Sequence, residues 1–256
     1  MQERPHLLVT NDDGIRAPGL LALRKACADV GHVTVLAPNH NWSASGHVKT
    51  MHKPLRISDV TLADGTEALT TTGAPSDAVT LALLGIVEEP IDLVVSGVNH
   101  GANLGHDVTY SGTVTAAMEA AIANLPAIAV SLNTRGQADF EPAARFAASL
   151  ARHTLEHGLP EGSLLNVNVP PLPADEIRGV KITRMGLRIY RDELIRRLDP
   201  RGKPYYWIGG PAPTGVEEEG TDIWAVANGY ISITPIQLDL TAHNLLSTLQ
   251  EWDLKP

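Results

Sequence analysis

Two adjacent carboxylates near the start of the chain are of a type and spacing that could hold a metal ion. Asp12 and Asp13 follow an apolar run at residues 7–9 and stand before Gly14. Consecutive strand residues point to opposite faces of a sheet, so both carboxylates can reach one ion only where the chain turns. Gly14 gives the backbone that freedom, and converging carboxylates bind a hard divalent cation. Asn-Asp-Asp-Gly is equally typical of a plain turn, so the motif alone favours neither interpretation.

Two later loops carry hydroxyl and amide groups that could complete such a site. The serine hydroxyls of residues 38–47 could bind a cation or hold a phosphate, although a serine-rich loop is by default only a loop. Residues 96–105 are more specific, because their repeated glycines let the backbone approach a ligand while Asn99 and Asn103 add amide groups. These loops predict polar groups gathered around a small ligand.

A Ser-Gly-Thr sequence then opens a predicted helix. Ser111, Gly112 and Thr113 offer two hydroxyls and the free N–H groups of a helix start, which are the ingredients of a phosphate site. N-capping explains Ser111 or Thr113 equally well and is compatible with that role. The chain contains neither a dinucleotide-binding nor a P-loop glycine motif, and it lacks the Gly-x-Ser-x-Gly elbow of serine hydrolases.

The elements that must position these groups alternate between strand and helix. Continuous apolar strands are expected at residues 7–10, 33–37, 68–72, 93–98, 127–131 and 164–169, and helices at 18–29, 75–84, 113–123 and 141–157. Apolar strands alternating with helices predict an α/β fold with a Rossmann-like, doubly wound, mostly parallel sheet. Ligands bind at the carboxyl ends of the strands in such sheets, and each polar loop follows a predicted strand.

The last third of the chain has a different pattern. Residues 1–170 are expected to form the Rossmann-like core, and residues 171–256 a β-rich C-terminal arm with short strands at 179–184, 205–208 and 230–234 and no helix before the tail near His243. Short strands of this kind bury little surface by themselves. We therefore expect the strands at 205–208 and 230–234 to pair across a subunit interface in a homodimer or homotetramer.

Composition limits the class of protein. The chain has 256 residues, of which 43% are hydrophobic, so a large core can form. No stretch of about 20 apolar residues and no signal-like N-terminus are evident, which predicts a cytoplasmic protein without a membrane partner. The formal charge of -9 repels polyanions, so no stable nucleic-acid partner is expected. The single cysteine, Cys27, is expected to be a buried apolar residue.

Taken together, the motifs resemble those of the stationary-phase survival protein SurE family. The similarity covers nearly the whole chain in the same order, through residues 8–14, 42–46, 72–77, 96–105, 110–114, 199–202, 206–209, 220–222, 229–235 and 239–243. The resemblance implies a divalent-metal-dependent acid phosphatase that hydrolyses nucleoside 5′- and 3′-monophosphates. It also implies a Rossmann-like core and a C-terminal arm used in oligomerisation.

The resemblance also implies roles for individual residues. The expected ligands of one divalent ion per subunit, Mg²⁺, Mn²⁺ or Ca²⁺, are Asp12, Asp13, Ser43 and Asn99. Asn11, Asp12 and Asp13 are the expected catalytic residues, and Asn103, Ser111, Gly112 and Thr113 are expected to bind the substrate phosphate. The chain departs from the family pattern at Asn39, Trp42 and Ala78, the first two of which leave rate and base selectivity open.

Several other polar residues have weaker claims to a role. His100 and His106 could protonate the leaving oxygen, although loop histidines are more often bystanders. Asp77 is expected to favour its helix N-terminus rather than do chemistry. Asp239 and His243 are expected to form an ion pair in the arm.

The chemistry that fits these features is phosphomonoester hydrolysis assisted by a metal ion, with an aspartate directing the attacking water. A metal-dependent deacetylase or amidohydrolase also uses paired aspartates, but it calls for a histidine pair that is missing nearby. A nucleotide sensor without catalysis remains a third possibility on the same fold. The base is expected to be recognised loosely, by stacking near Trp42.

Overall fold

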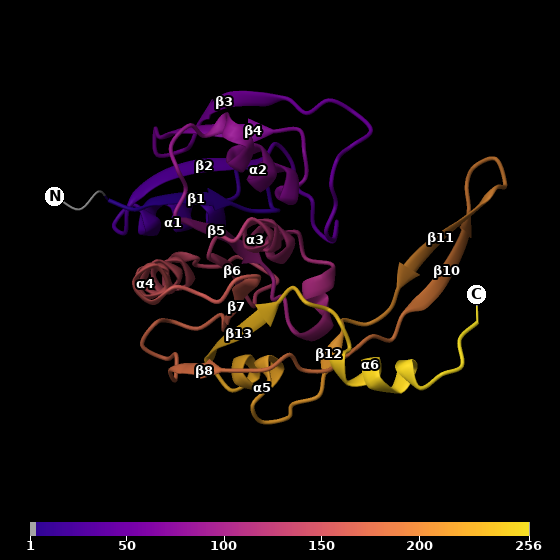
Figure 1. Ribbon diagram of the computed structural model, residues 1–256. Coiled ribbons are helices and arrows are strands. Elements are labelled where there is room, and N and C mark those ends of the chain that lie inside the picture. The colour runs from indigo at the N-terminus through magenta and orange to yellow at the C-terminus, as the bar shows by residue number, and fades with distance from the viewer. Residues whose placement is uncertain (1–3, 256) are drawn as a thin grey trace.

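Apolar strands form a nine-stranded sheet in the computed structural model, which describes residues 4–255 (Figure 1). The strands run in the order β3-β4-β2-β1-β5-β6-β7-β13-β8. Their bounds are β1 (His6–Thr10), β2 (His32–Pro38), β3 (Ile57–Thr61), β4 (Glu67–Thr71), β5 (Leu93–His100), β6 (Ala127–Leu132), β7 (Ser163–Val169), β8 (Val180–Ile182) and β13 (Ile231–Gln237). All neighbours from β4 to β7 are parallel, which confirms the mostly parallel sheet. Residues 1–3 and 256, at the outer limits of the two predicted parts, lie outside the described residues.

Helices cover both faces of this sheet. On one face, α1 (Pro18–Cys27) and α4 (Glu141–His157) pack against side chains such as Leu7 and Val9. On the other, α2 (Pro75–Leu81) and α3 (Gly112–Ile122) pack against Leu8. The π-helical turn Ala82–Ile86 continues α2, and a 3₁₀ turn at Gly105–Thr109 precedes α3. Because Leu7 and Val9 enter one core and Leu8 the other, residues 7–9 of the strand are all apolar, as a doubly wound sheet requires.

The strand order places the predicted site at a point where the chain changes direction. From β1 the chain moves outward to β2 and β4, and it then returns to the other side of β1 with β5, β6 and β7. The loops after β1 and β5 therefore diverge and leave a crevice between them at the carboxyl ends of the strands. Both loops contain predicted site residues, so the topology brings distant parts of the sequence together.

The C-terminal part corrects two sequence-based expectations. Strand β13 pairs antiparallel with β7 and parallel with β8 of its own chain, so the prediction that residues 230–234 pair across a subunit interface is wrong. Its buried side chains Ile231 and Ile233 join the core and give the strand a partner inside the subunit. The expectation of no helix before the tail is also wrong, because α5 (Asp222–Ala227) begins at a Thr221 cap.

The rest of the C-terminal part leaves the body of the molecule. Strands β10 (Glu193–Leu198) and β11 (Pro204–Gly209) form an antiparallel hairpin that extends to one side, and the C-terminal helix α6 (His243–Gln250) lies on the same side of the molecule (Figure 1). The short strands β9 (Arg188–Ile189) and β12 (Thr214–Gly215) pair where the hairpin leaves the core. None of the helices formed by the described residues is long and apolar enough to cross a membrane.

The close crossing of α1 over β5 generates a stability prediction. A methyl group at Gly19 would lie 2.1 Å from the carbonyl oxygen of Val98, so Gly19→Ala must displace the helix or the strand. Overpacking of this kind costs about 1–3 kcal/mol, and we expect urea unfolding to show a loss in that range. In the control Gly136→Ala, the added methyl group meets no atom within 4 Å. Equal unfolding midpoints for the two variants would contradict the tight crossing.

Candidate active site

The turn after β1 is held by the side chain of Asn11. Its Oδ1 accepts a hydrogen bond from the Gly14 N–H at 3.1 Å, and its Nδ2 donates to the Gly14 carbonyl at 3.1 Å. Gly14 has a φ of 99°, in the left-handed region, and a Cβ there would lie 3.1 Å from the carbonyl carbon of His40. The bend expected between the strand and the two aspartates is therefore present. Asn11 is fully buried with both ends of its amide occupied, so it positions the turn.

Asp12 projects into the start of α3 and is 3% exposed. The Thr113 hydroxyl donates to Asp12 Oδ1 at 2.5 Å. Gly112 makes this approach possible, because a Cβ at that position would lie 2.6 Å from the Asp12 Cβ. Burial raises the pKa of Asp12 to about 6; the Thr113 hydrogen bond opposes this, and the charge of Asp13 adds to it. The site thus holds a carboxylate whose charge lacks compensation by a cation.

Asp13 is bound by groups from the two neighbouring loops. Its Oδ1 accepts from Asn41 Nδ2 at 3.2 Å, and its Oδ2 accepts from the backbone N–H of His100 at 3.0 Å. The Trp42 N–H donates to the Asp12 carbonyl at 2.8 Å, and the Ser43 N–H donates to Asn41 Oδ1 at 2.7 Å. These bonds fold the second loop over the turn and bring Ser43 to the aspartates.

The end of β5 supplies the amide side chains. The register with β6 shifts between Ser96 and Asn99, an irregularity of the kind that re-aims a side chain. Asn99 is 9% exposed and donates through Nδ2 to the Gly101 carbonyl at 2.8 Å. Asn103 donates through Nδ2 to Ser131 at 2.8 Å. Both amides are therefore oriented before any ligand binds.

Two asparagines of β7 fix the backbone beside this loop. Asn168 Oδ1 accepts from the Asn103 N–H at 2.8 Å, while Asn166 and Asn168 both donate to the Asn103 carbonyl, at 2.9 and 3.0 Å. Both asparagines are fully buried, so water does not compete for the hydrogen bonds that their amides make. The apolar pattern of residues 164–169 predicts a strand, but it does not predict that two asparagines in it bind the Asn103 backbone.

The predicted residues converge on one cavity of about 270 Å³, which we call the Asp12 cup. Five residues with predicted roles line it: Asp12, Ser43, Asn99, Asn103 and Ser111. Asp13 stands at its edge through the His100 backbone, whereas Gly112 and Thr113 lie behind Asp12. His100 also lines the cup, but His106 is not among the lining residues.

The C-terminal part contributes a wall that sequence reasoning missed. Tyr190 lines the cup and donates its hydroxyl hydrogen bond to Asp107. Arg188 Nε pairs with the same carboxylate at 2.9 Å. Burial and the neighbouring Asp107 carboxylate raise the pKa of Tyr190 to about 12, so its hydroxyl keeps its proton at neutral pH. No motif in the sequence predicted that residues more than 80 positions apart would meet here.

A buried carboxylate ties this wall to the cup loop. Asp222 is fully buried and accepts from the N–H groups of Gly105 and Gly186, both at 2.7 Å, and of Ile223 at 2.8 Å. A Cβ at Gly105 would lie 2.3 Å from the Gly186 carbonyl oxygen, so the two backbones are in direct contact. The Gly-Thr-Asp motif at residues 220–222 is the part of the sequence that marks this contact. The partners of Asp222 become apparent only in the folded chain.

The remaining polar candidates lie outside the cup. Asp77 is buried and accepts from Thr50 and from the Ala74 N–H at the start of α2, as expected for a helix N-terminus. His243 and Asp239 form the expected ion pair at 2.6 Å. Two further groups of possible metal ligands are His6 with His32 and Glu89, and His153 with Glu156 and His157.

The Asp222 contacts predict a loss of stability in Asp222→Asn. The amide would oppose an N–H group and leave a buried donor unpaired, which costs about 1–3 kcal/mol in urea unfolding. Amide hydrogen exchange at Gly105 and Gly186 should accelerate together, because the two amides share this carboxylate. Asp59→Asn, on an exposed position of β3, is the matched control. Unchanged exchange at both glycines would show that Asp222 does not hold the loop.

Known proteins are similar to this chain in both sequence and fold. The family model described as Survival protein SurE matches residues 7–192. A 5'-nucleotidase SurE of Herpetosiphon aurantiacus is 54% identical over 92% of this chain and 93% of its own, and one of Chloroflexus aggregans is 50% identical over 97% and 99%. The crystal structure of the SurE protein from Aquifex aeolicus has a TM-score of 0.82 at 42% identity, covering 96% of this chain and 98% of its own. This chain therefore belongs to the SurE family.

Proposed function

We propose that this protein is a divalent-metal-dependent phosphomonoesterase that hydrolyses nucleoside 5′- and 3′-monophosphates. The observation that carries the proposal is the buried Asp12 carboxylate facing a cavity beside the free N–H groups at the start of α3. Relatives of nearly the same length are 5'-nucleotidases by name, which supports the same substrate class here. Tyr190 of the C-terminal part also lines the cup, which supports a role for residues 171–256 in the active unit as well as in the proposed oligomerisation.

The donor set of the cup fits one hard divalent cation. Asp12, Asp13, Ser43 and Asn99 would hold it through oxygen atoms, as suits Mg²⁺, Mn²⁺ or Ca²⁺. The raised pKa of Asp12 supports this, because a cation would compensate the buried charge. The residues lining the cup include no lysine or arginine, so an anionic substrate needs such a cation to approach two aspartates.

The start of α3 suits the substrate phosphate. Ser111 accepts a hydrogen bond from the Val114 N–H at 3.1 Å and keeps its own proton for an acceptor in the cup. The N–H groups of the first helical turn have no partner within the α-helix. The Thr113 N–H is used by the Asp12 carboxylate, whose pKa it lowers, so the Gly112 N–H is the backbone donor left for an anion. These donors and the positive end of the helix favour an anion at this point. Asn103 stands opposite, with its backbone fixed by the β7 asparagines.

Hydrolysis then depends on how the side chains share the work. A cation held by Asp12, Asp13, Ser43 and Asn99 would supply Lewis-acid stabilisation of the phosphoryl charge and would favour ionisation of water. Asp12 and Asp13 orient the attacking water and accept its proton, while the helix donors hold the phosphoryl oxygens through the transition state. Thr113 acts through Asp12, because its hydroxyl contacts that carboxylate rather than the cavity. Thr113 is therefore a positioning residue in this mechanism.

Two substitutions test the roles of Asp12 and Thr113. We expect Asp12→Asn to abolish phosphate release from AMP, because the metal site loses a charged ligand. The circular dichroism spectrum should stay normal, because Asp12 lies at the end of its strand, at the rim of the core. Thr113→Val should weaken Mn²⁺ binding by about ten- to a hundredfold, the range for groups that orient a metal ligand. Calorimetric titration with MnCl₂ measures this effect, and Thr154→Val on α4 is the control. Wild-type turnover by Asp12→Asn at saturating metal would overturn the proposal.

A substrate panel tests the class of reaction. The wild-type protein should release phosphate from 5′-AMP, 3′-AMP, 5′-UMP and 4-nitrophenyl phosphate in the presence of Mn²⁺, Mg²⁺ or Ca²⁺. Differences in kcat/KM between bases should stay below about a hundredfold, because apolar contacts discriminate less than dedicated hydrogen bonds. Binding of nucleotides without phosphate release would favour a sensor, and release of acetate from N-acetylated substrates a deacetylase.

The projecting hairpin supports a homo-oligomer. Leu194, Trp207 and Ile208 on the hairpin are 71%, 61% and 81% exposed, and α6 adds exposed Leu245 and Leu249. An apolar surface of this extent marks an interaction site, and we propose that a second copy of the chain covers it. The proposal rests on these side chains and no longer on unpaired strands.

A charge placed on the hairpin tests this association. Leu194→Glu combined with Ile208→Glu should lower the sedimenting mass at micromolar concentration. Association would then bury two charged glutamates in the interface, which is unfavourable. Leu84→Glu, at an 80% exposed leucine away from the hairpin, should leave the mass unchanged. A monomeric wild-type protein in analytical ultracentrifugation would contradict the homo-oligomer.

A further inference from the structure

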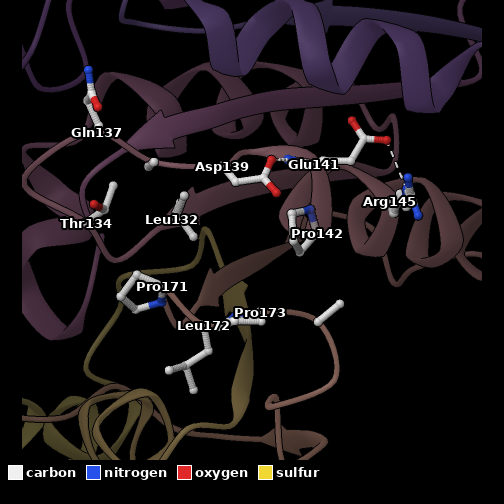
Figure 2. A pocket seen from close by; sticks show the side chains of 12 residues that line it. Leu132, Thr134, Gln137, Asp139, Glu141, Pro142, Arg145, Pro171, Leu172 and Pro173 are labelled. Carbon is white, nitrogen blue, oxygen red and sulfur yellow. Dashed lines mark hydrogen bonds and ion pairs between the residues drawn. The ribbon is translucent and has the colours of Figure 1, made fainter.

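A larger cavity lies next to the Asp12 cup, at the carboxyl ends of β6 and β7. It has a volume of about 490 Å³, within the range of roughly 300–1,000 Å³ typical of small-molecule sites. In Figure 2 the Asp139 carboxylate and the Pro142 ring face residues 171–173 across this cavity. Leu132 and Leu172 add apolar surface. We call this space the β6–β7 pocket; the mechanism above makes no use of it.

A third hollow shares lining residues with both the cup and the β6–β7 pocket. His100 lines both the cup and the hollow, while Gln137 and Asp139 line both the hollow and the pocket. The His100 backbone N–H bonds Asp13, and its ring Nε2 lies 2.7 Å from the Gly136 carbonyl oxygen. One residue therefore bridges the aspartates to the loop that forms the pocket wall. A molecule with its phosphate in the cup can extend across His100 into the pocket.

The charges of the β6–β7 pocket indicate which part of a substrate fits. The two carboxylates among the lining residues, Asp139 and Glu141, outnumber the one guanidinium, that of Arg145, whose Nε pairs with Glu141 Oε1 at 2.9 Å (Figure 2). Asp139 Oδ1 accepts the Glu141 N–H at 2.9 Å, and Oδ2 has no hydrogen-bond partner among the described residues. A carboxylate oxygen repels anions and accepts from hydroxyl groups. The pocket is therefore suited to an uncharged group with hydroxyls, next to an apolar surface.

Resting on the proposed function, we propose that the β6–β7 pocket binds the nucleoside part of a ribonucleotide and that Asp139 recognises the ribose 2′-hydroxyl. The base lies against the apolar surface of Pro142, Pro171 and Leu172, which has no fixed donor pattern to select one base. A carboxylate that accepts from a ribose hydroxyl is the usual means of ribose recognition in doubly wound folds. This arrangement makes Asp139 a specificity-determining residue and predicts tolerance of the base together with a preference for ribose.

The experiment compares adenosine with 2′-deoxyadenosine by calorimetric titration of the full-length protein. Asp139→Asn keeps Oδ1 for the Glu141 N–H and replaces the other oxygen by a donor, so the loop is retained. Asp175→Asn, a neighbouring exposed carboxylate outside the lining, is the matched control for loss of charge. We expect the wild type and Asp175→Asn to bind adenosine about tenfold more tightly than 2′-deoxyadenosine, the ratio of one lost hydrogen bond to a charged group. In Asp139→Asn this ratio should fall to near one.

Kinetics separate this inference from the proposed function. With 5′-AMP and 5′-dAMP, Asp139→Asn should raise the KM for the ribonucleotide and leave kcat unchanged, while hydrolysis of 4-nitrophenyl phosphate, which lacks a ribose, stays at the wild-type rate. An unchanged ratio of ribose to deoxyribose binding in Asp139→Asn, or no adenosine binding by the wild type, would overturn the inference. Failure of the wild type to hydrolyse any phosphomonoester would contradict the proposed function, whatever the nucleoside titrations show.

Discussion

The site depends on holding two like charges side by side at the end of a strand, one of them almost completely buried. Asp12 and Asp13 repel each other, and burial adds to the cost of the Asp12 charge. The surroundings offset this cost with donors: the Thr113 hydroxyl for Asp12, and the Asn41 amide and the His100 N–H for Asp13. A cation in the proposed position would offset the rest, so the two adjacent carboxylates themselves provide the attraction for a metal ion.

The remaining architecture serves to keep these donors in place. The reversal of strand order beside β1 opens the crevice, and each loop around it is fixed from outside: by Asn166 and Asn168 of β7, and by Asp222 from the C-terminal part. Asp222 joins Gly105 and Gly186, which are 81 positions apart in the sequence, through their backbone N–H groups. A site assembled from loops thereby acquires the rigidity of the sheet, which precise placement of charges requires.

The sequence was informative where local patterns determine structure. Apolar runs located the core strands and the four helices α1 to α4 that cover the sheet. The Asn-Asp-Asp-Gly sequence located the turn at Gly14. Residues near β13 were assigned to an interface because a strand's partner is set by long-range pairing, which no local pattern encodes. Tyr190 and Asp222 were missed as parts of the site for the same reason: their contacts depend on how the C-terminal part folds back onto the core.

Anomalous diffraction from a crystal of the full-length protein soaked in MnCl₂ tests the central claim most directly. The account predicts a strong manganese peak in the Asp12 cup, within ligand distance of the oxygen atoms of Asp12, Asp13, Ser43 and Asn99. A cup without a peak, with manganese found only at the cluster of His6, His32 and Glu89, would contradict it.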